Sequence, residues 1–176
     1  AMDGVEAVTP FMSIWLDGYI VGGRGERYKM ERLYSLTGVY PEALEQFGYR
    51  LSEGEYITEQ GGKKLQLLFG QNVAYQFEDS KRKPPNNMVD PWPDEQGKIA
   101  DPFVDPMKDS FTLVLPYNEG KSELTYDIQV TGVLEAGDLN SYETQYNIYI
   151  DVRDFKRIQE EYNKAAKTKD SSGGRD

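Results

Sequence analysis

Proline is concentrated in one segment of this chain, and that concentration limits the fold more than any other feature. Six of the nine prolines lie between residues 80 and 110, at positions 84, 85, 91, 93, 102 and 106. Because proline lacks an N–H donor and has a fixed φ, most of this segment can form neither a helix nor a central strand. A loop of this length is uncommon inside a compact domain, so the sequence predicts a functional excursion or a disordered one.

Strand-like sequence lies on both sides of the proline-rich segment. Before it, we expect a long strand over residues 8–21, a strand over 27–40 paired back on the first with a bulge near Ser35, and a buried strand over 65–69. After it, apolar alternation predicts strands over residues 111–115, 126–134 and 146–150, with a slip at Gly132 in the second of these.

Helical signals occur at three places. Pro41, followed by acidic residues, predicts a short helix that ends near Gly48. Val73, Ala74 and Phe77 share one helical face and predict a helix over residues 71–79. A final helix should follow Asp151 as its cap, because apolar residues then recur every three or four positions: Val152, Phe155, Ile158 and Tyr162.

Together these patterns predict the fold class α+β, with a mostly antiparallel sheet, two or three helices and a long proline-rich loop. A chain of 176 residues has the length of one domain. We expect that domain to cover residues 1–167, with the loop inserted at 80–110 and a flexible tail at 168–176.

The composition removes several function classes. Without cysteine or histidine, the chain cannot form disulfides, Cys/His zinc sites or a nucleophile paired with imidazole. Its formal net charge of -10 repels nucleic acid and anionic lipid alike. We therefore expect no nucleic-acid partner and no cofactor, and most familiar hydrolase mechanisms are excluded. The many carboxylates keep two alternatives open, a glycosidase that uses two carboxylates and a site for a hard cation. No segment has the spacing of an EF-hand.

Aromatic side chains are the remaining candidates for a binding site. Trp15, Trp92 and Phe103 could stack on sugars or anchor a peptide. The alternative for Trp15 and most tyrosines is a half-buried position on a sheet face. Trp92 is the strongest candidate because its neighbours Pro91 and Pro93 limit the conformational entropy that it loses on binding.

Several short pieces occur in an order that is typical of one protein family. After VTP at 8–10, the chain reads LTGVYPE at 36–42, LSEGEYIT at 51–58, LLFGQNVA at 67–74, DIQVTGVL at 127–134 and YIDV at 149–152. In order and spacing, these pieces resemble the extracytoplasmic, MacB-like domain of ABC transporter permeases of the FtsX superfamily. The resemblance covers most of the chain, but the acidic, proline-rich segment at 80–105 is an insertion, and Asp105-Pro106 is the remnant of a family Asp-Pro-x-Gly element.

This resemblance implies a noncatalytic domain outside the cell membrane. Its partners would be the transmembrane part of the same permease, indirectly a cytoplasmic ATPase subunit, and a peptide, lipid or small-molecule substrate. The chain would then be an excised part of a longer membrane protein, and the inserted loop would be its recognition element. The alternative from another class is a secreted module that binds glycan or peptide through its tyrosine and tryptophan faces.

Overall fold

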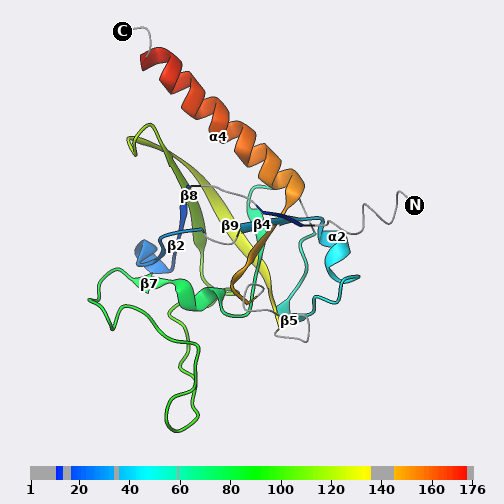
Figure 1. Ribbon diagram of the computed structural model, residues 1–176, viewed down its shortest axis with the longest axis vertical. Coiled ribbons are helices and arrows are strands. Elements are labelled where there is room, and N and C mark those ends of the chain that lie inside the picture. Colours follow the sequence, from blue (N-terminus) through cyan, green and yellow to red (C-terminus); the bar gives the residue numbers. More distant parts are fainter. Residues whose placement is uncertain (1–10, 14–16, 34–35, 59, 136–144, 174–176) are drawn as a thin grey trace.

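A computed structural model of the chain describes residues 11–13, 17–33, 36–58, 60–135 and 145–173, with the backbone alone over 11–13 and 168–173. Ten strands form one sheet (Figure 1): β1 (Phe11–Ser13), β2 (Tyr19–Gly22), β3 (Tyr28–Met30), β4 (Leu36–Val39), β5 (Leu51–Gly54), β6 (Leu65–Phe69), β7 (Glu78–Asp79), β8 (Phe111–Tyr117), β9 (Ser122–Leu134) and β10 (Ile148–Asp151). In the described residues the α-helices are α2 (Pro41–Leu44) and α4 (Val152–Gly173), and the 3-10 turns are η1 (Arg24–Glu26) and η2 (Val73–Gln76).

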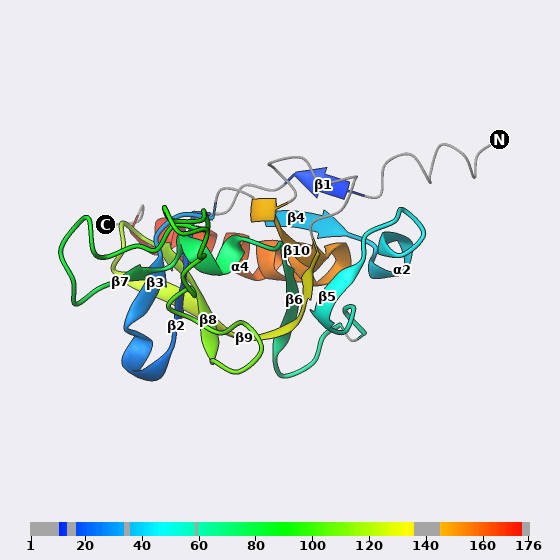
Figure 2. The ribbon, with the colours of Figure 1, turned by 90° about the horizontal axis from the view of Figure 1, so that it is seen from below.

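The sheet is curled and mostly antiparallel, which gives the mixed α+β fold class (Figure 2). The strand order is β1-β4-β10-β6-β9-β8-β2-β3-β7, and β5 pairs with β9 outside this path. The parallel pairs are β4 with β10 and β6 with β9. Strand β9 is long enough to pair with β8 near its start and with β5 near its end, so it joins the two halves of the sheet.

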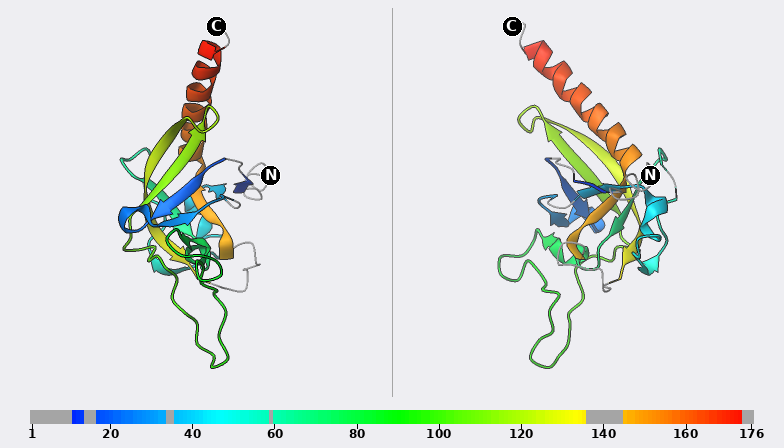
Figure 3. Two further views of the ribbon diagram at one scale, coloured as in Figure 1. Left: turned by 90° about the vertical axis from the view of Figure 1, so that its left-hand side faces the viewer. Right: turned by 45° about the vertical axis from the view of Figure 1, so that its right-hand side comes forward.

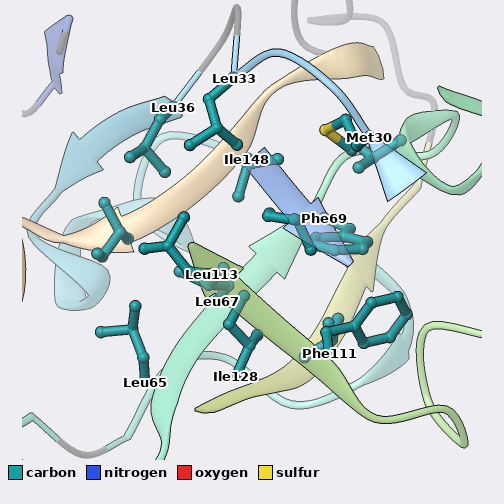
Figure 4. Packing of buried hydrophobic residues seen from close by; sticks show 14 of the residues in the cluster. Met30, Leu33, Leu36, Leu65, Leu67, Phe69, Phe111, Leu113, Ile128 and Ile148 are labelled. Carbon is teal, nitrogen blue, oxygen red and sulfur yellow. The ribbon is translucent and has the colours of Figure 1, made fainter. Parts of the chain in front are cut away.

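The core is organised around β6, whose five residues are all buried. Leu65, Leu67 and Phe69 point into the main hydrophobic cluster (Figure 4). Leu68 belongs to a second cluster, together with Leu44 of α2. Burial on both faces is what a short, continuously apolar strand predicts, and the expected strand over residues 65–69 is confirmed with the same bounds.

Helix α4 begins where the sequence predicts it. The Asp151 carboxylate accepts a hydrogen bond from the Arg153 backbone N–H at 2.9 Å, which is the expected N-cap contact. Phe155 and Ile158 are buried against the sheet. Further along, the Tyr162 hydroxyl donates to the Pro116 carbonyl at 3.2 Å, so the helix lies along the β8–β9 hairpin (Figure 3).

Four expectations need correction. Residues 8–21 do not form one strand, because β1 pairs with β4 whereas β2 pairs with β3 and β8. Residues 27–40 contain two separate strands, β3 and β4, which pair with different neighbours. Residues 71–79 form the short turn η2 and strand β7 instead of a helix. The backbone of α4 continues to Gly173, past the end at residue 167 that the sequence predicts.

Other expectations are confirmed. Pro41 occupies a first-turn position of α2, and the pairing of β9 with β6 shifts register between Val130 and Gly132. The bulge expected near Ser35 lies outside the described residues. No helix in the described part of the chain combines the length and the apolar character that a bilayer span requires.

Candidate functional site

The chain between β7 and β8 leaves the sheet and returns to it, and we call residues 80–110 the excursion. It contains no helix or strand. The excursion extends from the end of the molecule that lies opposite the C-terminal end of α4 (Figures 1 and 3). The two features therefore mark the two ends of the long axis.

Hydrogen bonds divide the excursion into parts. The Asp79 backbone N–H donates to the Asn87 carbonyl at 2.8 Å, which closes a first loop against the end of β7. The Tyr75 hydroxyl of η2 donates to the Ala100 carbonyl at 2.7 Å, which returns the chain to the body of the domain. Residues 89–99 project between these two attachments, and we call them the finger.

The end of the finger is a closed turn built on Asp94. The Asp94 carboxylate accepts hydrogen bonds from the backbone N–H groups of Gln96 and Lys98, both at 2.9 Å. The Asp94 N–H donates to the Lys98 carbonyl at 2.8 Å. Gly97 has a φ of 79°, which glycine adopts at low cost. The turn is thus held by local hydrogen bonds and has a defined shape.

Apolar side chains are exposed on this part of the molecule. Trp92 is 56% exposed and Ile99 is 50% exposed, and both belong to the finger. Met88, at its base, is 44% exposed and lines a shallow hollow with Met30. A tryptophan this exposed leaves a large apolar surface in contact with water, which is typical of an interaction site.

Charged and aromatic residues hold the base of the excursion together, and we call this group the base cluster. Its members are Arg27, Tyr28, Asp79, Arg82 and Phe103. Arg27 donates to both carboxylate oxygens of Asp79, at 2.8 and 2.7 Å, and Arg82 pairs with the same carboxylate at 3.2 Å. Hydrogen bonds from Arg27 are the largest cause that lowers the pKa of Asp79 to about 2.

The aromatic half of the base cluster joins the two ends of the excursion. Phe103 stacks on Tyr28 with ring centroids 5.4 Å apart, and the Arg82 guanidinium lies 5.4 Å from the Phe103 ring centre. The next residue, Val104, is 2% exposed and belongs to the main core. Phe103 thus lies at the anchored base, apart from Trp92 on the finger.

Of the three residues selected from the sequence, the two that the structure describes, Trp92 and Phe103, are therefore not brought into one site. Trp92 is on the projecting finger, Phe103 is in the base cluster, and Trp15 lies outside the described residues. What the sequence analysis missed is the set of attachments, because no local pattern predicts that Tyr75 bonds to Ala100 or that Asp79 bonds to Asn87. Only the meeting of η2, β7 and the returning chain creates them.

A second hollow, of about 750 Å³, is lined by the end of β5, by β6 and β9, and by residues 106–110 before β8. Its lining is mostly polar and includes Gln66, Lys108, Gln129 and Thr131. This groove was also not predicted, since its walls come from segments that are distant in sequence. Within the described residues, acidic side chains do not gather in a group of three or more that could hold a metal ion.

Comparison with known proteins gives no assignment for this chain. No protein-family model matches it, and the search of curated proteins gives no match.

Proposed function

We propose that this chain is a noncatalytic extracytoplasmic domain of an ABC transporter permease of the MacB and FtsX type. The proposal rests on the ordered sequence pieces at residues 36–42, 51–58, 67–74, 127–134 and 149–152. In this role the domain contacts a substrate or partner outside the membrane, and it couples that contact to the cycle of the cytoplasmic ATPase.

The observation that carries the recognition role is Trp92, which is 56% exposed on a projection attached at both of its ends. The excursion lies opposite the C-terminal end of α4 (Figure 1). On this proposal the finger is the part of the domain that contacts the substrate or partner.

The packing of the domain also suits transmission of movement. Helix α4 is fixed to the sheet by Phe155 and Ile158 in the core and by the bond from Tyr162 to the β8–β9 hairpin. A displacement of α4 along its axis would therefore move the sheet, and with it the excursion, as one body.

The first experiment reads the gene that encodes this chain. A full-length gene with four or more membrane spans around this segment, and a neighbouring ATPase gene, supports the permease. A gene with a signal peptide and no span contradicts it and supports the secreted binding module instead.

The second experiment uses the full-length protein assembled with its ATPase. We expect Trp92→Ala to impair transport or signalling by about tenfold while basal ATPase activity stays near the wild-type level, because the finger lies outside the core. The matched control is Phe47→Ala, which removes an exposed aromatic side chain that is far from Trp92 in the sequence. Equal function of the Trp92 variant and the wild type would reject the finger as the recognition element.

A further inference from the structure

The shape of the finger limits what it can bind. Sites for small molecules are concave and enclose most of the ligand, whereas residues 89–99 form a narrow projection (Figure 3). A small ligand would keep most of its surface in water when it touches such a projection. A ligand for Trp92 must therefore supply the concave surface itself, and this requires a macromolecule.

The finger is also preorganised for binding. It is attached next to Met88, through Asn87, and at Ala100, and its end is closed by the Asp94 turn. Pro91 and Pro93 flank the tryptophan. Because less conformational entropy is lost when such a loop docks, a single tryptophan can supply much of the binding free energy.

Charge selects among macromolecules. Within residues 89–99 the charged side chains are Asp90, Asp94, Glu95 and Lys98, which gives three negative charges, one positive charge and a sum of −2. All four residues are exposed. Nucleic acids and anionic membranes are repelled by this charge and by the net charge of the whole chain, whereas a surface rich in lysine and arginine is attracted.

We propose that the finger docks into an apolar pocket of a partner protein, and that lysine or arginine side chains rim this pocket. Trp92 fills the pocket, and Asp90 and Glu95 face the basic rim. This inference rests on the recognition role proposed above for the excursion, and it adds the chemical class of the partner.

The test uses the isolated chain and a phage-displayed library of small folded domains with randomised concave surfaces. We expect selection on the wild type, with counter-selection on Trp92→Ala, to enrich domains whose randomised surfaces combine apolar and basic residues. The purified domains should bind Trp92→Ala at least about tenfold more weakly than the wild type. They should bind the control variant Phe47→Ala unchanged.

A second set of variants tests the charge. Asp90→Asn with Glu95→Gln should weaken binding of the selected domains several-fold, and added salt should weaken binding of the wild type toward the level of this double variant. Asp94 is left in place because it forms the turn. A double variant that binds as the wild type does, or binding that is independent of salt, would overturn the basic rim.

Tryptophan also favours lipid interfaces, so the finger could bind a membrane instead of a protein. Binding to vesicles of neutral phosphatidylcholine tests this alternative. Trp92-dependent binding to these vesicles would overturn the proposal, as would selected domains without basic residues or a selection that enriches no domain. These failures leave the permease assignment standing, because that assignment is tested on the gene and on the assembled transporter.

Discussion

Asp79 is the residue on which the base of the excursion depends. It is 1% exposed, yet it is charged, because two arginines and the Lys81 backbone N–H bond to its carboxylate. A buried carboxylate with this many donors is stabilised as an anion. The same residue donates its own N–H to Asn87, so one position fixes both the ion cluster and the first loop.

Because of this arrangement, the stability of the protein depends on pH in the acidic range. The folded state lowers the pKa of Asp79 to about 2, so its contribution is present above the ordinary carboxyl pKa of about 4 and is lost as the pH falls toward 2. We expect Asp79→Asn to lower Tm at pH 7 and to reduce the further loss between pH 4 and pH 2. Thermal unfolding monitored by circular dichroism at both pH values measures this. The exposed Asp90→Asn is the control, and an identical pH profile for Asp79→Asn and the wild type would contradict the prediction.

Gly54 is required where β5 meets β9. Its φ is 79°, and a Cβ at this position would overlap the Thr131 carbonyl oxygen. We expect Gly54→Ala to lower the free energy of unfolding by about 3 kcal/mol, because both the backbone and the contact are strained. Gly120 is the matched control, since it has a φ of 81° with nothing within 4 Å.

Chemical denaturation of both glycine variants measures the difference. Gly120→Ala should lower the free energy of unfolding by only about 1 kcal/mol, because only the left-handed backbone is strained there. If the two variants lose the same free energy, the close approach of β5 to β9 contributes nothing.

At the scale of elements, the sequence predicted some helices and strands correctly and others wrongly. The apolar run of β6 and the three- and four-residue spacing of α4 were predicted correctly. The pattern over 71–79 was wrong because Val73, Ala74 and Phe77 are buried equally well by a 3-10 turn that leads into a strand. Three apolar positions are too few to distinguish a helix from such a turn.

Substitution of Ile158 tests how firmly α4 is packed on the sheet. It is fully buried in the main core, with an exposed fraction of 0%. We expect Ile158→Ala to destabilise the protein by about 2 to 5 kcal/mol through lost burial and the cavity left behind. Lys156→Ala, two residues away on the exposed side, should change stability by no more than about 0.5 kcal/mol. Urea unfolding compares them, and a small loss for Ile158→Ala would show that α4 is only loosely docked.

At the scale of the whole molecule, the excursion separates into an anchored base and a projecting finger. Val104 of the base is part of the core, whereas nearly all residues of the finger are exposed. The prolines predict only that residues 80–110 lack regular structure. Which part of that segment supports the fold depends on contacts with η2, β3 and β7.

Replacing the finger tests this division. We expect a chain in which residues 89–99 are replaced by Gly-Ser-Gly to unfold cooperatively, with a Tm within a few degrees of the wild type, because a shorter loop changes closure entropy only slightly. Replacement of residues 101–106, which removes Phe103 and Val104, should instead lower Tm strongly. Differential scanning calorimetry measures both. Loss of cooperative unfolding in the first replacement would show that the finger is part of the core structure.

The sequence alone determined those features that depend on neighbouring residues. Proline spacing excluded regular structure from residues 80–110, apolar periodicity predicted β6 and α4, and Asp151 marked the start of the final helix. Flanking prolines also pointed to Trp92. Only the tertiary structure decided that β1 and β2 join different strands, that Phe103 belongs to the base, and that Tyr75 and Asp79 attach the two ends of the finger. These contacts join residues far apart in the chain, and local sequence patterns carry no information about which distant groups will meet.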